Sequence, residues 1–215
     1  MKTRCIRELV WVFLLTAALA ACGGGGGGAV LPPAAHQTSV KLAQTGQTAS
    51  YDVNTVKADD GALKLGVAWP SPRFMPISAG TGTVITDNLT GLMWAGDPTL
   101  SSLCSAGTTT TWQGALDYVV CLNSKTYLSH ADWRLPNRKE LRSLINYGQA
   151  NTAAWLNTPG VGNPGFSNVQ ADYYWSSTTY AGVTSNAWGV GMGGGSVYGG
   201  GKSSGSYVWP VRSGQ

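Results

Sequence analysis

The sequence predicts an α+β domain in which two helices accompany a mostly antiparallel, twisted sheet. Three observations lead to this class. A β-branched run at 83–86, a turn and an apolar run at 92–94 are typical of a β-hairpin. Two segments, beginning at Trp112 and Arg138, repeat apolar residues at helical spacing. After about residue 165, apolar residues recur at every second position, as they do in strands.

The first residues have the composition of a bacterial export signal. Basic residues come first, namely Lys2, Arg4 and Arg7. The apolar run that follows, 9–21, is too short to span a membrane comfortably. It ends in small residues before Cys22, which resembles the lipobox of bacterial lipoproteins. That resemblance implies a signal peptide at 1–21 and a lipid on Cys22 that anchors the chain to a membrane. A plain secretory signal with a chance cysteine is the alternative.

The rest of the chain divides into three parts by composition. Residues 22–38 form a Gly/Pro-rich tether, 39–80 a polar lead-in that is irregular or short-stranded, and 81–215 the domain. Gly23 follows Cys22 where an aspartate would resemble an inner-membrane retention signal. The sequence therefore predicts an outer-membrane lipoprotein, and its periplasmic or cell-surface face is left open.

Composition excludes several classes of function. Only 11% of the residues are charged and the formal net charge is +4, with no clustered basic patch, so we expect no nucleic-acid partner. The motifs of serine hydrolases, zinc proteases and dinucleotide-binding enzymes are missing, and His130 is the domain's one histidine. Gly201-Lys202-Ser203 lacks the earlier glycine of a phosphate-binding loop. We expect no enzyme, no catalytic residue and no cofactor.

Two cysteines remain after the signal and the lipid site are set aside. In an exported domain, Cys104 and Cys121 predict one disulfide. A metal-binding or redox pair is the alternative, although no CxxC motif occurs. Asp87, in the turn of the hairpin, is a lone carboxylate, and Asp172 is the one acid in the C-terminal third, so we expect no metal site.

The first helix is expected from Trp112 to Leu122. Thr111 is a plausible N-cap. Its apolar face is predicted to consist of Trp112, Ala115, Leu116, Val119 and Val120.

The second helix is expected after Asn137, which with Glu140 has the spacing of a capping box. The helix should end near residues 147–148. Glu140 and Arg134 could form a catalytic pair, but a helix cap with a structural ion pair is the simpler interpretation.

Strands are expected in the last part of the chain. They begin with 173–178, continue with 188–192 and a return strand from Val197, and end with a one-sided strand at 207–211. Trp175 and Trp209 are expected in the core, and Trp188 either in the core or at the surface.

Five motifs occur in order and carry a family resemblance. They are Thr86–Trp94 (TDNLTGLMW), Thr111–Leu116 (TWQGAL), Asp132–Leu141 (DWRLPNRKEL), Tyr174–Ser177 (YWSS) and Trp209–Gly214 (WPVRSG). From about Asp59 to its end, the chain resembles the bacterial Lcl C-terminal-domain-like family, named for a collagen-like adhesin. The resemblance implies a C-type-lectin-like fold and a displayed domain that binds glycans or other ligands.

Two further resemblances concern function. The Trp-Arg-Leu-Pro entry to the second helix is similar to formylglycine-generating enzymes, but those need late cysteines and none follows Cys121. The C-terminal stretch is rich in Gly, Ser and Tyr, as antibody paratopes are, and Lys202 is its one charged residue. In this it is similar to variable proteins diversified by retroelements.

The sequence therefore favours a binding module for a glycan or a cell-surface protein. The residues expected to contact the ligand are Tyr180, Ser185, Asn186, Trp188, Ser196, Tyr198, Lys202, Ser204, Ser206 and Tyr207. The alternatives are a structural envelope lipoprotein without a ligand and an oxidoreductase like the formylglycine-generating enzymes.

Overall fold

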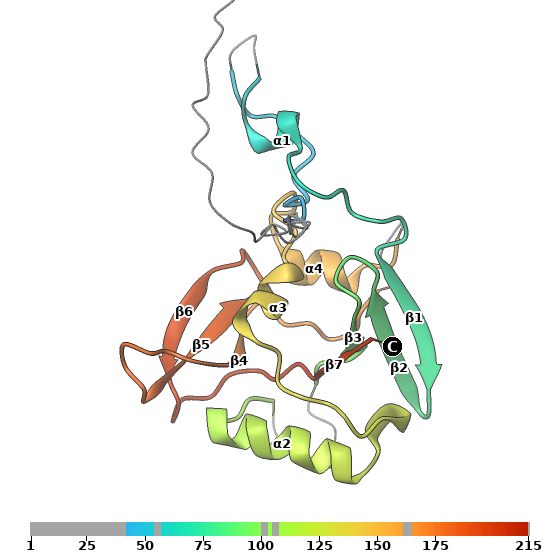
Figure 1. The fold of residues 1–215 in the computed structure, drawn as a ribbon, viewed down its shortest axis with the longest axis vertical. Helices are drawn as coiled ribbons and strands as arrows, with labels where there is room; N and C mark the ends of the chain where they lie inside the picture. Colours follow the sequence, from blue (N-terminus) through green and yellow to red (C-terminus); the bar gives the residue numbers. More distant parts are fainter. Residues whose placement is uncertain (1–41, 54–56, 100–102, 105–107, 161–164, 215) are drawn as a thin grey trace, which may run out of the picture. The chain divides into compact units, whose positions relative to one another are not determined.

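A computed structural model describes residues 42–53, 57–99, 103–104, 108–160 and 165–214. Its elements are α1 (Asp60–Leu63), β1 (Phe74–Ala79), β2 (Gly82–Asp87), β3 (Leu92–Ala95), α2 (Trp112–Ser124), the 3-10 helix η1 (Tyr127–Ser129), α3 (Arg138–Ser143), α4 (Thr152–Asn157), β4 (Tyr173–Thr179), β5 (Asn186–Gly191), β6 (Val197–Gly201) and β7 (Val211–Ser213). Short helices and two antiparallel sheets confirm the α+β class (Figure 1). The predicted signal, Cys22 and tether lie outside the described residues.

A four-stranded sheet has the order β1-β2-β3-β7. The predicted hairpin is present as β2 and β3, with Ile85 opposite Trp94. β1 lies in the segment interpreted as a lead-in and pairs with β2 over its whole length, so that the expected boundary at residue 81 falls in the β1–β2 turn. The last strand, β7, pairs with β3 and brings the C-terminal residues to the first hairpin.

A three-stranded sheet has the order β4-β5-β6. Its register places Gly189 opposite both Trp175 on β4 and Tyr198 on β6, while Trp188 lies opposite Gly199. An irregularity between Trp175 and Thr179 interrupts the pairing of β4 with β5. Because alternate residues of a strand point to opposite faces, this register decides which face each aromatic side chain occupies.

The segment between β6 and β7 joins the two sheets. Tyr207 forms a parallel bridge with Tyr174 of β4, whereas Val211 bridges Arg134 and begins β7. Val208 and Trp209 are both fully buried, so the expected one-sided strand at 207–211 is wrong. Neighbouring residues are buried together here because core side chains surround the crossing chain on both sides.

The core of the domain is rich in aromatic rings. The Trp209 ring lies 5.6 Å from that of Trp94, 5.2 Å from that of Phe166 and 5.4 Å from that of Tyr174, measured between centroids. Trp175 is also fully buried, so the expectation that Trp175 and Trp209 belong to the core is confirmed. Tilted and edge-to-face pairs of this kind stabilise a core beyond the area that they bury.

Helix α2 begins as the sequence predicts. The Thr111 side chain accepts a hydrogen bond from the Gly114 N–H and caps the helix. The buried residues are Ala115, Tyr118, Val119 and Leu122. Val120 is 68% exposed, so its placement on the apolar face is wrong. The buried stripe follows the spacing i, i+3, i+4, i+7 from Ala115, which turns Val120 toward solvent.

The predicted disulfide is confirmed. Cys104 and Cys121 are bonded, with their Cα atoms 5.7 Å apart. The bond ties the last turns of α2 to the segment that precedes the helix, and the alternative of a metal-binding or redox pair is set aside for these two residues.

Helix α3 shows the complete capping box of Asn137 and Glu140. The helix ends at Ser143 rather than near residue 147, and a separate helix, α4, follows. Leu144 and Ile145 are buried although they lie beyond the helix, because the turn that follows folds back onto the core.

No helix within the described segments is long and apolar enough to cross a membrane.

A buried ion pair holds the first hairpin to the rest of the domain. Arg73 and Asp87 are 2% and 0% exposed, and their side chains form two hydrogen bonds of 3.1 Å. Arg73 also donates to the Ser143 carbonyl at 2.6 Å. Asp87 accepts two more hydrogen bonds, from the Leu89 N–H and the Thr90 hydroxyl. This carboxylate therefore organises the turn of the Thr86–Trp94 motif.

Candidate functional site

The predicted contact residues differ in their exposure. Tyr180, Ser185, Ser196, Tyr198 and Ser204 are exposed, and Asn186, Trp188, Lys202 and Tyr207 are half-buried. Ser206 is only 4% exposed, so its outward placement is wrong. Its backbone exchanges two 3.0 Å hydrogen bonds with Thr110, which draws it against the segment before α2. Tyr207 packs its ring against that of Tyr174 at 5.4 Å.

The predicted contacts do not form one surface. Tyr180 lies over Gly199, because a Cβ added there would be 2.9 Å from its ring. Gly199 is opposite Trp188, so Tyr180 and Trp188 share a face of the β4–β5–β6 sheet. Tyr198 directly precedes Gly199 on β6 and therefore occupies the other face.

Three side chains form a compact group, which we name the Trp188 cluster: Arg138, Tyr180 and Trp188. The Tyr180 and Trp188 ring centroids are 4.7 Å apart with their planes tilted by 49°. The Arg138 guanidinium carbon lies 4.7 Å from the Trp188 ring centroid, on the face where a cation is attracted by the ring electrons. Tyr180 is 36% exposed and the other two are half-buried.

Local structure fixes the position of Arg138. The capping box starts α3 at this residue, and the Arg138 N–H donates to the Thr178 hydroxyl of β4 at 3.1 Å. A shallow hollow of about 220 Å³ adjoins the cluster, lined by Asn137, Arg138, Lys139 and Thr178. Neither Arg138 nor Lys139 forms an ion pair with a described residue. The cluster therefore combines stacked rings with two cations and polar groups.

Residues 83–212 match a family model described as the Lcl C-terminal domain. The match covers nearly all of β2 to β7, this cluster, four of the five ordered motifs and most of the fifth. The chain belongs to the Lcl C-terminal domain family. No curated protein matches it. In this Lcl C-terminal domain the motifs have largely structural roles, because they supply the Asp87 turn, the Thr111 cap and the capping box of α3.

The opposite face of the same sheet carries a second aromatic group. The rings of Tyr173 and Tyr198 are 4.1 Å apart, and the Tyr173 and Ser196 hydroxyl oxygens are 3.1 Å apart. Lys202 is directed inward, with its Nζ atom 4.0 Å from the Trp112 ring centroid and 3.0 Å from the Thr179 hydroxyl. Lys202 therefore joins the β6 end to α2 instead of standing free for an anion.

The residues of the catalytic alternative have structural partners. Glu140 accepts hydrogen bonds of 2.7 and 2.8 Å from Arg134 and one of 2.8 Å from the Asn137 N–H. Burial alone would raise the pKa of Glu140, but these hydrogen bonds outweigh it and lower the pKa below its usual value. The cap and ion-pair interpretation of Glu140 and Arg134 is confirmed. No three metal-ligating side chains gather among the residues that the structure describes.

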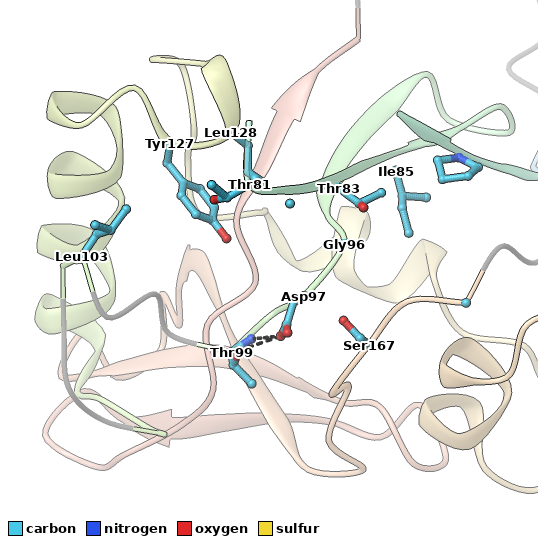
Figure 2. Close-up of a pocket in the computed structure, with 13 residues that line it drawn as sticks. Thr81, Thr83, Ile85, Gly96, Asp97, Thr99, Leu103, Tyr127, Leu128 and Ser167 are labelled. Carbon is cyan, nitrogen blue, oxygen red and sulfur yellow. Dashed lines mark hydrogen bonds between the residues drawn. The ribbon is translucent and has the colours of Figure 1, made fainter. Parts of the chain in front are cut away.

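The Lcl C-terminal domain also has a larger pocket, of about 800 Å³, beside the four-stranded sheet. Figure 2 shows it between the β1–β2 hairpin, the segment after β3 and η1. Tyr127 reaches into it from η1, and Asp97 and Thr99 line it. Burial, followed by the charge of Asp97, raises the pKa of Tyr127, which keeps its hydroxyl protonated.

The sequence predictions left out residues of both the Trp188 cluster and the larger pocket. Arg138 was expected only as a residue at the start of a helix, although the capping box fixes its backbone directly after the cap. Thr178 was seen only as a strand residue. The pocket gave no sequence signal, because Tyr127 and Asp97 are thirty residues apart in the chain and belong to no motif.

Proposed function

We propose that the protein is an adhesin-like, lipid-anchored surface or periplasmic protein whose Lcl C-terminal domain binds a glycan through the Trp188 cluster. The observation that carries this proposal is the cluster itself, in which the Tyr180 ring lies 4.7 Å from that of Trp188 and the Arg138 guanidinium lies over the Trp188 ring. Membership of the Lcl C-terminal domain family supports an adhesin-like role.

The chemistry of the cluster suits a sugar. Aromatic rings offer an apolar surface on which the C–H face of a sugar ring stacks, and they lose little conformational entropy when they do so. Arg138 presents several N–H donors in a fixed plane, and Lys139 adds a mobile charge. Asn137 and Thr178 provide amide and hydroxyl groups for the sugar hydroxyls. The two unpaired cations favour a glycan that carries acidic groups.

The place of action is part of the proposal. A lipid on Cys22 would anchor the chain in the outer membrane, and the glycine-rich tether would hold the domain away from the lipid surface. Globomycin treatment of expressing cells, which blocks lipoprotein signal cleavage, should cause an uncleaved precursor to accumulate. A chain that is still cleaved and released would contradict the lipid anchor.

The proposal includes no catalytic step. Glu140 already serves a cap and an ion pair, and Cys104 and Cys121 are joined in a disulfide. The domain would therefore act by binding alone.

The stretch that carries Tyr180 and Trp188 would also be the diversified part of the protein. Support comes from exposed Tyr and Ser side chains on a buried frame, since Tyr180, Ser185 and Ser204 face solvent while Trp175 and Trp209 do not. Coding sequences of this locus from many isolates should differ mainly at codons for the exposed residues. Differences spread evenly over core and surface codons would exclude diversification.

A glycan-array and cell-surface binding screen of the exported protein tests the function. We expect saturable binding to a set of glycans that weakens as salt is raised, because the two cations contribute. Arg138→Gln should keep the domain folded, reduce affinity and flatten the salt dependence. Binding to a protein alone, or binding that Arg138→Gln leaves unchanged, would refute glycan recognition by this cluster.

A further inference from the structure

The pocket in Figure 2 is a separate place for a small ligand. It shares no lining residue with the Trp188 cluster or its hollow. Its volume of about 800 Å³ lies in the range of about 300–1,000 Å³ that small-molecule sites occupy. β1, β2 and the segment after β3 supply one side, while η1 and Ser167 supply others.

The polar groups of the pocket are mostly hydroxyls. Thr81, Thr83, Tyr127 and Ser167 contribute hydroxyls to the lining, and none of these forms a side-chain hydrogen bond with another described residue. Each can therefore donate to or accept from a ligand. Thr83 and Tyr127 are half-buried, while Thr81 and Ser167 are exposed at the rim. Hydroxyls that no described side chain satisfies favour an occupant that is itself rich in hydroxyl groups.

Asp97 is the one charged residue among those that line the described pocket. One carboxylate oxygen accepts from the Thr99 N–H at 2.8 Å and from the Thr99 hydroxyl at 2.7 Å. The other accepts from the Asn168 amide at 2.7 Å. These bonds fix the orientation of the carboxylate and still leave lone pairs for a ligand donor. With this negative charge and no cation in the lining, an anionic ligand is disfavoured.

An aromatic platform completes the pocket. Tyr127 begins η1, and three non-glycine residues around it have positive φ: Thr126, directly before η1, at 50°, and Leu128 and Ser129, within η1, at 49° and 63°. Such backbone is uncommon, and it clusters where a structure holds a side chain in a required place. The ring of Trp133 lies behind Tyr127 at 6.1 Å, and Figure 2 shows the Tyr127 hydroxyl directed toward the side that carries Asp97.

We propose that this pocket binds one neutral sugar ring, stacked on Tyr127 and hydrogen-bonded to Asp97, Thr83 and Ser167. The apolar face of a pyranose would lie against the ring, and one sugar hydroxyl would donate to the free lone pairs of Asp97. The Thr83 and Ser167 hydroxyls would donate to ring or hydroxyl oxygens. This site is independent of the Trp188 cluster. It would prefer neutral sugars, whereas the cluster favours acidic ones.

Titration of the isotope-labelled, exported protein by NMR tests the inference. The probes are the methyl glycosides of glucose, galactose and mannose, together with N-acetylglucosamine, and glucuronate serves as the charged counterpart. We expect amide shifts at Thr83, Asp97, Tyr127 and Ser167 with a dissociation constant on the order of millimolar for at least one neutral sugar. Glucuronate should bind at least about tenfold more weakly, because Asp97 repels its carboxylate.

Two variants separate this site from the cluster. Thr83→Val keeps the side-chain shape, removes one hydroxyl and should weaken the neutral sugar by about five- to twentyfold. Tyr180→Ala, in the Trp188 cluster, should leave these shifts unchanged. A failure of glycan binding at the cluster can therefore be told apart from a failure of sugar binding in this pocket. No shifts at the pocket with any neutral sugar, equal binding of glucuronate, or unaltered binding by Thr83→Val would overturn the inference.

Discussion

The buried ion pair between Arg73 and Asp87 makes the sharpest prediction about stability. Asp87→Asn changes almost no volume but removes the negative charge that faces a guanidinium only 2% exposed. Arg73 would keep its hydrogen bond to the Ser143 carbonyl and its position 4.2 Å over the Trp69 ring centroid. Its Nη1 atom already has no hydrogen-bond partner among the described residues, so little remains to compensate the charge.

The expected cost follows from the burial of both partners. Removal of one member of a buried ion pair costs about 3–5 kcal/mol, because the other charge stays in a poorly solvated place. For a domain of this size each kcal/mol lowers the melting temperature by about 2–4 °C, so a loss of about 6–20 °C is expected. Glu140→Gln is the control, since the partner it leaves behind, Arg134, is 41% exposed and stays solvated, and it should cost less than about 1 kcal/mol.

Urea unfolding at pH 7, followed by Trp fluorescence with the disulfide intact, measures both variants against the unaltered protein. The slope with urea should stay constant, so that the shift in midpoint reports stability. A double variant, Arg73→Met with Asp87→Asn, should recover much of the loss, because no charge is left buried and the amide oxygen introduced at position 87 can still accept a hydrogen bond from the turn. A cost for Asp87→Asn below about 1 kcal/mol, equal to that of the control, would refute the reasoning.

Three further predictions concern the disulfide, the capping box and the cluster. Replacing Cys104 and Cys121 by Ser should cost about 3 kcal/mol in urea unfolding, from a closed loop of 17 residues, and no change would show that the bond does not constrain the unfolded chain. Glu140→Gln keeps the cap but removes the ion pair. The pKa of Glu140 is lowered in the folded protein, so its ion pair should contribute up to about 1 kcal/mol above about pH 4.3, the ordinary glutamate pKa. This contribution should vanish as the pH falls through the folded pKa. A stability difference between Glu140→Gln and the unaltered protein that grew in acid would contradict this. Gly199→Ala places a Cβ 2.9 Å from the Tyr180 ring and should weaken glycan binding without unfolding, whereas Gly194→Ala, which meets no atom within 4 Å, should leave binding unchanged.

Much of the fold was predictable because local chemistry fixes it. Thr111 and Asn137 are cap residues whose side chains satisfy backbone N–H groups, and such bonds depend on a few neighbours in sequence. The two remaining cysteines were enough to predict the disulfide once export of the chain was expected, because disulfides persist in oxidising compartments. Trp175 and Trp209 were expected in the core, and both are fully buried, but their neighbours Tyr174 and Val208 are buried as well, so strand alternation does not account for the result.

The remaining features depend on contacts between distant residues. Ser206 was expected among the outward contacts, but a backbone bridge to Thr110 buries it. The ion pair of Arg73 with Asp87 joins the start of β1 to a turn. No local sequence pattern indicates which arginine pairs with which aspartate. The predicted contact surface divided in two because the register of β6 with β5, which a sequence does not specify, sends Tyr180 and Tyr198 to opposite faces.

The most direct test of the central claim uses two tyrosines of equal exposure. Tyr180 and Tyr198 are each 36% exposed and lie on opposite faces of the same sheet, so Tyr180→Ala and Tyr198→Ala remove similar surface from different places. Affinity for the glycan found in the array screen is measured for both by calorimetry. The Trp188 cluster predicts a two- to tenfold loss (about 0.5–1.5 kcal/mol) for Tyr180→Ala and less than about twofold for Tyr198→Ala. The reverse order, or equal losses, would contradict glycan binding through the Trp188 cluster.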